Sequence, residues 1–521
     1  MKKRDAPKVV FKVYDQQQSM LLPPTLDELI AANHPVRVVN KVLDKIDIQP
    51  LINQYKPGGA SSFHPRMLLK VIVFAYISNI YSSRKIEAAL QESIYFMWLS
   101  ARSTPDHHTI NRFRGERLKE PLQKIFTQVV ELLIAEGLLN IKELYTDGTK
   151  IEANANRYTF VWGKAIKSSK ERIKKQLDEL LKYAQQLAFE ELEDSDPSGF
   201  DKIDAEKVEK TIDKINEALK DKPAGKEVKQ KLNYAKKNWP ANLKKYAEQE
   251  KLMGQQRSSY SKTDPDATFM RMKEDHMKNG QLKPAYNVQI STNNQFIASY
   301  SVHQKTTDTN TLTDHLASHE NQYNQTPEVL VADAGYGSEE NYQALEDKGI
   351  EAYIKHNQFD RQQNKNIQSK KPFAPHKLHY NKEKDCYYCP MGQGMKNIGT
   401  AVKTTATGFK QTLTKYQAKN CEGCPLRGAC HKGQGNRIIE VNHNLNHLKQ
   451  KADERLLSEV GIRHRKQRPC DVEPVFGNIK SNHHFKRFML RGIKKVATET
   501  GLLALAHNLR KKYALNMKKA A

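Results

Sequence analysis

The sequence predicts an α/β protein: a sheet with flanking helices, preceded by an all-helical region and interrupted by two insertions. Five strand-like segments alternate with helical or turn segments, at residues 144–151, 285–292, 295–302, 329–333 and 350–354. A charged block with helical periodicity follows the first strand, and a basic, loop-rich stretch with all six cysteines follows the last. At 521 residues, the chain has room for three or four domains.

The chain is strongly basic. Its 85 lysines and arginines outnumber 59 acidic residues, which gives a formal net charge of +26 and a pI near 9.5. Such a protein binds nucleic acid at least non-specifically, because each neutralised phosphate releases counterions. A basic protein that is merely soluble is the alternative.

Membrane insertion and secretion are both disfavoured by the sequence. The mean hydropathy is -0.75. The most apolar run, residues 67–81, contains Lys70 and Ser78 and falls short of the roughly 20 apolar residues that a spanning helix needs. The basic start is not followed by an apolar segment, and six cysteines are too few for a disulfide scaffold. We therefore expect a cytoplasmic protein with no membrane partner.

Residues 1–135 are predicted to be helical. Apolar residues recur at helical spacing, as in the segment LLKVIVFA that begins at Leu68, after a turn at residues 56–59. A polar loop then leads into a basic helix, where Arg112 and Arg114 are expected to contact phosphates. An ordinary solvated helix face is the alternative.

Residues 164–260 are predicted to form a charged helical insertion. Apolar residues recur every three or four positions in two runs, which predicts a buried seam with lysine and glutamate on the other faces. Turn signals at residues 194–199 and 222–225 divide the block into about three helices. We expect an inert, packed helical hairpin. The seam residues are Ile173, Leu177, Leu180, Ala184, Leu187, Val208, Ile212, Ile215 and Leu219.

Three acidic residues stand out by their context. Asp147 lies in the middle of a strand and is followed by Gly148, and a strand interior disfavours both residue types. Asp333 ends a buried strand, and Glu473 opens a late helix with Lys480 two turns later on the same face. Carboxylates that meet at the carboxyl ends of strands would bind two Mg²⁺ or Mn²⁺ ions, and Lys480 would hold a phosphate beside them.

Each acid taken singly has an ordinary interpretation. Asp147 would be a bulge residue, Asp333 a turn residue and Glu473 a solvated acid in the first turn of a helix. The order of strand with Asp, hairpin, strand with Asp, and helix with Glu is more specific. It favours a phosphodiester-cutting site in a basic protein.

Five cysteines form two Cys-x-x-Cys pairs and a nearby single residue: Cys386 and Cys389, Cys421 and Cys424, and Cys430. The spacing suits a tetrahedral structural Zn²⁺, and a reducing cytosol favours a metal over a disulfide. Cys430 is able to replace one of the four paired ligands. The alternative is that the cysteines pack a small subdomain without metal. Cys470 stands apart and is expected to be a small core residue.

Basic residues flank the helix that Glu473 opens, and a path for DNA over this region is predicted. Together with the two arginines of the helical region, the residues that we expect to contact DNA are Arg112, Arg114, Arg157, Arg465, Arg468, Lys480, Arg487 and Arg491.

The chain resembles bacterial insertion-sequence transposases of the DDE type. The strongest pieces are YTDGTKIEANAN at residues 145–156, AYNVQ at 285–289, VADAGYGS at 331–338 and VEPVFG at 472–477, followed by Lys480. The resemblance implies an RNase H-like catalytic domain with a mixed five-stranded sheet and flanking helices. It also implies that Asp147, Asp333 and Glu473 are the metal-binding triad. Arg468 lies one residue farther from Glu473 than the usual spacing of the family.

The resemblance implies phosphoryl transfer without a covalent enzyme intermediate. Transposon inverted-repeat ends would be cut with the help of two Mg²⁺ or Mn²⁺ ions, and the freed 3′-hydroxyl would attack target DNA. The partners would be double-stranded DNA at the ends and at the target, with a homodimer or larger assembly in the complex, on the bacterial nucleoid. A catalytically inactive repressor derived from a transposase and another RNase H-like nuclease are the alternatives.

On this interpretation the chain divides into six parts. They are a helical DNA-binding region at 1–135, the first part of the catalytic domain at 136–163, the helical insertion at 164–260, the second catalytic part at 261–355, the cysteine-bearing insertion at 356–470, and the last catalytic helices at 471–521.

Overall fold

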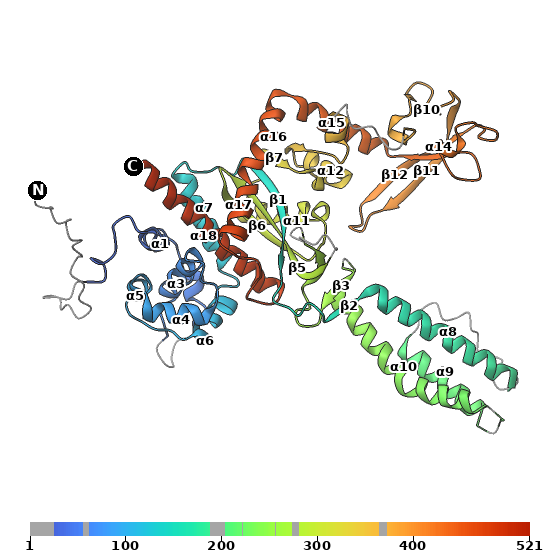
Figure 1. Cartoon of the computed structure of the whole chain (residues 1–521), viewed down its shortest axis with the longest axis horizontal. Coiled ribbons are helices and arrows are strands. Elements are labelled where there is room, and N and C mark those ends of the chain that lie inside the picture. The colour runs from blue at the N-terminus through green and yellow to red at the C-terminus, as the bar shows by residue number, and fades with distance from the viewer. Residues whose placement is uncertain are drawn as a thin grey trace, which may run out of the picture.

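A computed structural model describes residues 25–55, 62–187, 204–220, 222–223, 225–255, 257–272, 281–363 and 372–520 (Figure 1). The predicted turn at 56–59 and the predicted break at 194–199 lie outside these residues. Every helix within the described ranges is too short or too polar to cross a membrane.

The central sheet is mixed. β1 pairs in antiparallel fashion with β5 and in parallel with β7, which pairs in parallel with β8. The other edge of β5 is shared by β4 and β6, both antiparallel to it. The strands are β1 (Glu143–Glu152), β4 (Thr268–Arg271), β5 (Leu282–Asn293), β6 (Phe296–His303), β7 (Val329–Ala332) and β8 (Glu351–Ile354).

The sheet therefore has six strands, and the expectation of five was wrong by one. β4 was missed because it is only four residues long and follows the helical insertion directly. The turn between β5 and β6 is tight: Asn294 and Gln295 have φ values of 52° and 60°. Two consecutive residues in the left-handed region suit the right-handed twist of a hairpin, and asparagine tolerates that conformation well.

Helices cover the sheet. α11 and α18 pack against β6, while α12, α15 and α16 pack around β8, with α16 also contacting β7. The helices of this layer are α7 (Leu122–Ala135), α11 (Leu312–Tyr323), α12 (Glu339–Asp347), α15 (His443–Leu457), α16 (Glu459–Asp471), α17 (Glu473–Gly477) and α18 (Ile493–Ala520). The short α13 (Phe359–Gln363) follows β8.

The N-terminal helices share one hydrophobic core with the sheet domain. α18 packs against α3 and α7 as well as against β6, so the last long helix joins the two regions (Figure 1). The elements are α1 (Pro35–Asp44), α2 (Gln49–Ile52), α3 (Pro65–Ile77), α4 (Ser83–Glu92), α5 (Ile94–Ser100), α6 (His107–Arg112) and a π-helical turn, η1 (Phe113–Arg117).

The helical insertion has a core of its own. Its helices are α8 (Gly163–Leu187), α9 (Ala205–Ala218) and α10 (Lys226–Met253), and they project away from the sheet (Figure 1). All of the predicted seam residues are buried except Leu187, which is partly buried. The chain enters and leaves the insertion through two paired antiparallel strands, β2 (Phe160–Trp162) and β3 (Ser259–Ser261).

The cysteine-bearing stretch contains a five-stranded antiparallel sheet, although the sequence predicted mostly loops. The sequence indicates one strand-like stretch between the two Cys-x-x-Cys pairs, and the structure has two strands there, β11 and β12. The hairpin was not predicted as such because most β11 side chains are exposed, so no apolar alternation marks that strand. The elements are β9 (Tyr380–Asn381), β10 (Cys386–Tyr388), β11 (Gly394–Thr404), β12 (Lys410–Ala418), α14 (Arg427–Cys430) and β13 (Ile438–Val441).

Three buried histidines should make the folded chain sensitive to acid. Burial lowers the pKa values of His303, His319 and His507 from 6.5 to about 4. The folded state then binds fewer protons than the unfolded state between pH 6.5 and pH 4, so the free energy of unfolding should fall as the pH falls through this window. The expected loss from pH 7.5 to pH 5 is about 2 kcal/mol for each histidine.

Urea unfolding at pH 7.5, 6 and 5 would measure this loss. His319 offers the sharpest test, since neither of its ring nitrogens has a hydrogen-bond partner among the described residues. In a His319→Leu variant the acid-dependent loss should be smaller by about 2 kcal/mol. An unchanged pH dependence in that variant would show that His319 does not contribute.

Candidate active site

The first two acids are neighbours on adjacent parallel strands. The ladder between β1 and β7 ends at the pair Thr146 and Ala332, and the next residue on each strand is Asp147 and Asp333. Asp147 is buried. One carboxylate oxygen of Asp333 accepts a hydrogen bond of 2.8 Å from the backbone N–H of Gly335, which fixes the turn after β7. The structure thus brings these two acids together at the carboxyl end of β7, as expected for a site in a parallel sheet.

Arg468 on α16 connects the third acid to this pair. Its Nη1 lies 3.6 Å from Oδ2 of Asp147, and its Nη2 donates a 3.0 Å hydrogen bond to Oε1 of Glu473. Glu473 is more than half exposed, while the side chain of Arg468 is 20 % exposed. The single positive charge of the guanidinium therefore lies beside two of the three predicted ligand carboxylates.

A second layer of polar residues supports Asp147 and was not predicted from the sequence. Oδ1 of Asp308 accepts hydrogen bonds of 2.8 Å from the Asn287 amide and 3.0 Å from the Gln289 amide. The Tyr336 hydroxyl donates to the Gln289 carbonyl oxygen. Burial, reinforced by the charges of Asp308, Asp147 and Asp333, raises the pKa of Tyr336 well above its usual range. A fourth carboxylate therefore stands close to the predicted pair.

This arrangement explains the glycine after Asp147. A Cβ on Gly148 would overlap the Gln289 amide and would lie 2.6 Å from Oδ1 of Asp308. Only glycine permits both groups to approach the backbone of β1. Gly148 within a strand was the sequence signal for such an approach, but Asp308 lies in a polar segment whose residues show no periodic pattern.

Lys480 does not follow the α-helical spacing that the sequence suggested. α17 ends at Gly477, and residues Asn478–Asn482 form a π-helical turn, η7. A π-helical turn contains more residues than an α-helical turn, so the seven residues from Glu473 to Lys480 do not make two regular α-helical turns. Lys480 is partly buried.

The chemistry of the donors fits a hard divalent cation, because carboxylate oxygens are the ligands that Mg²⁺ and Mn²⁺ prefer. The ligands are not assembled, however: among the described residues, no three histidine, cysteine, aspartate or glutamate side chains form a group ready to hold an ion. Arg468 lies between Asp147 and Glu473. A cation shared by these two acids requires that the guanidinium move away.

Two of the predicted DNA contacts in the helical region have different surroundings. The Arg112 side chain is 70 % exposed and lies 3.6 Å from Glu116. Arg114 is only 2 % exposed, and its guanidinium donates to the carbonyl oxygen of Tyr81 at 2.6 Å and to the Tyr76 hydroxyl at 3.3 Å. The prediction that Arg114 contacts phosphates is therefore corrected: it is a buried structural cation.

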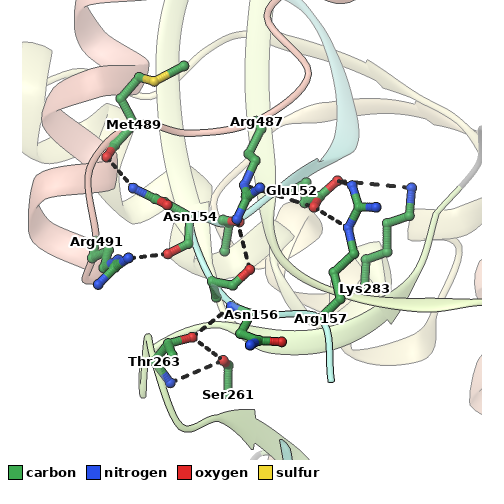
Figure 2. A network of polar contacts seen from close by, with 12 residues as sticks. Glu152, Asn154, Asn156, Arg157, Ser261, Thr263, Lys283, Arg487, Met489 and Arg491 are labelled. Carbon is green, nitrogen blue, oxygen red and sulfur yellow. Dashed lines mark hydrogen bonds and ion pairs between the residues drawn. The ribbon is translucent and has the colours of Figure 1, made fainter. Parts of the chain in front are cut away.

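Three other predicted DNA contacts gather around the segment that follows β1 (Figure 2). Arg157 donates two hydrogen bonds, of 2.7 and 2.9 Å, to the carboxylate of Glu152. Arg487 donates to the carbonyl oxygens of Ala153 and Ala155, and Arg491 donates to that of Asn154. These arginines hold the end of β1 against the loop before α18. Arg157, Arg487 and Arg491 remain exposed, so their contact with DNA stays a prediction.

The last predicted DNA contact, Arg465, is partly buried on α16. Its guanidinium lies 5.1 Å from the centre of the Phe359 ring, a cation–π distance. Cys470, at the end of the same helix, is exposed, so the expectation of a core residue was wrong.

Four of the five candidate zinc ligands line one cavity of about 20 Å³. They are Cys389, Cys421, Cys424 and Cys430. Cys386 lies on β10, pairs with Lys396 of β11, and is absent from the cavity wall. All six cysteines are free thiols.

Comparison with known families gives two matches. A model of the family Transposase DDE domain matches residues 388–513, which include Arg468, Glu473 and Lys480. A model of the family Transposase domain (DUF772) matches residues 24–116 in the helical region. No curated protein and no solved structure matches the chain. The mixed sheet with helices around it accords with the RNase H-like fold that the first family implies. Both matches are to transposase domains, and together they support an insertion-sequence transposase of the DDE type.

Proposed function

We propose that this transposase cuts DNA strands at the inverted-repeat ends of its element and joins the freed ends to target DNA. The observation that carries the proposal is that Asp147, within β1, lies next to Asp333 at the carboxyl end of β7, with Glu473 tied to Asp147 through Arg468. Carboxylates at the end of a sheet in a protein of charge +26 suit a reaction on a polyanionic substrate.

Each residue of the site has a proposed task. Asp147, Asp333 and Glu473 would hold the divalent cations. Two such ions, when bound, activate the attacking oxygen and neutralise the charge that develops on the scissile phosphate. Lys480 would hold a neighbouring phosphate, and Arg468 would release at least one of its acids as the site is loaded.

The supporting residues would fix the geometry of this pocket. Gln289 and Asp308 pack against Gly148, Tyr336 holds Gln289, and together they would restrict the position of Asp147. Preorganised charges are the main contribution that a protein makes to phosphoryl transfer. Joining two ends of one element would require at least two copies of the chain, so we propose a dimer or larger assembly acting on DNA of the nucleoid.

The test is cleavage of DNA that carries the short inverted repeats flanking the gene. Purified protein with Mg²⁺ or Mn²⁺ should cut at the repeat ends and join the 3′-hydroxyl ends to a second duplex. A scrambled repeat and a chelator are the controls. Binding of the repeats without cleavage would indicate a repressor, and cleavage that ignores the repeats would indicate a general nuclease; either result contradicts the proposal.

A further inference from the structure

The cysteine-bearing sheet holds a cluster of thiols that the transposition reaction does not use. Cys389 follows β10, Cys421 and Cys424 follow β12, and Cys430 ends α14, yet all four line the same small cavity. Arg427, Arg437 and His431 line the same cavity beside apolar residues such as Leu426 and Met391, so charged and polar groups stand next to the thiols. Buried polar groups in such a place need partners.

Left-handed glycines turn the chain inside the second Cys-x-x-Cys pair and shortly after Cys389 of the first. Gly423, inside the second pair, has a φ of 67°, and Gly392, which follows the first pair, has a φ of 76°. The N–H of Gly392 donates a 2.8 Å hydrogen bond to the carbonyl oxygen of Cys389, so the chain turns back directly after that residue. Glycine adopts these left-handed conformations at no steric cost.

Positive and N–H groups surround the sulfurs. The Arg437 guanidinium lies 2.9 Å from Sγ of Cys430, and the backbone N–H of Arg437 donates to Sγ of Cys421 at 3.3 Å. Nε2 of His431 is buried without a hydrogen-bond partner among the described residues. Hydrogen bonds of this kind stabilise metal-bound thiolates, and two arginines would offset the charge of −2 that four thiolates and one Zn²⁺ carry.

The cysteine-bearing subdomain also needs a source of stability besides its hydrophobic core. Its hydrophobic core contains only seven buried residues among those described, and one of them is Cys421 itself. So small a core rarely stabilises a five-stranded sheet, and a structural metal is one of the usual supplements.

We propose that Cys389, Cys421, Cys424 and Cys430 bind one structural Zn²⁺ and that Cys386 does not. This set differs from the two complete Cys-x-x-Cys pairs, because the cavity excludes Cys386 and includes Cys430. The sulfurs as placed do not yet form a ligand group, so the side chains must turn toward the centre of the cavity. The ion would lock the base of the β11–β12 hairpin to the segment 421–430.

Zinc content of the full chain tests the proposal. Protein purified in the presence of a mild chelator should retain about one zinc per chain, measured by plasma mass spectrometry. Cys389→Ser and Cys421→Ser should lose it, whereas Cys386→Ser and His431→Gln should keep it. Loss of zinc in Cys386→Ser would overturn the assigned ligand set.

A thiol titration of the unsubstituted protein tests the same proposal without depending on whether the variants fold. In the native chain, Cys386 and Cys470 should react quickly with a thiol reagent, and the other four of the six cysteines should react only after a strong chelator is added. The proposal would be overturned if all six thiols of the native chain reacted quickly. It would also be overturned if fewer than six thiols reacted under denaturing conditions without metal. Zinc content is independent of DNA cleavage, so this test and the test of the transposase reaction can fail separately.

Discussion

Asp147→Asn is expected to lower the rate of metal-dependent strand cleavage by about a thousandfold, because a lost cation ligand removes several kcal/mol of charge stabilisation from the transition state. Asparagine has nearly the same shape as aspartate, so the fold should be retained. Asp333→Asn should have a similar effect, since Asp147 and Asp333 each come directly after the last residue pair between β1 and β7.

The matched control is Asp360→Asn. Asp360 lies on α13 with a side chain that is 69 % exposed, and it pairs with Lys355 at 2.9 Å. Cleavage rates, Mn²⁺ affinity and melting temperature would be measured for each variant. The assignment of the site fails if Asp147→Asn cuts as fast as Asp360→Asn, or if Mn²⁺ binds both with equal affinity.

Arg114→Ala is expected to reduce the free energy of unfolding by about 3–5 kcal/mol, the usual cost of removing one partner from a buried charge network. Glu499 is fully buried, and burial raises the pKa of its carboxyl. The Tyr76 hydroxyl bridges the two charges, donating to Oε1 of Glu499 at 3.1 Å and accepting from Arg114 at 3.3 Å. Without the guanidinium, the carboxylate of Glu499 would be buried with no opposite charge, or Glu499 would have to take up a proton.

Arg112→Ala provides the comparison, because it removes the same side chain two residues earlier. Arg112 is exposed, and its ion pair with Glu116 is worth about 0.5 kcal/mol or less. Urea unfolding of the two variants, at equal protein concentration, measures the difference. Equal stability would mean that Arg114 is not the structural cation that its burial indicates.

The sequence revealed those parts of the site that break local rules. Aspartate and glycine are disfavoured inside strands, and Asp333 ends an apolar run. Asp147, Gly148 and Asp333 are therefore each unusual in their sequence context. Asp308 gave no such signal, because an acid in a polar segment is ordinary. Only the pairing of β1 with β5, which sets Gln289 opposite Gly148, shows that Asp308 reaches the site.

Arg112 and Arg114 show a different limit. Residues two apart on a helix point in different directions, so the sequence already implied that both could not face one partner. Which of the two turns inward depends on Glu499 of α18, whose position follows from the tertiary packing of that helix against α3. The sequence indicated a strand-like stretch between the cysteine pairs but not the hairpin of β11 and β12, because its pairing depends on backbone hydrogen bonds and leaves little pattern in exposed side chains.

The entry to the helical insertion has a consequence for how such proteins change over evolutionary time. β2 and β3 lie side by side, so the two ends of the insertion are held together by the host domain itself. A short turn joining Trp162 to Ser259 would close the chain without disturbing the sheet, since chain ends that lie close tolerate exchange of what is between them. Related chains are therefore free to lengthen, shorten or replace this arm while keeping the same central sheet.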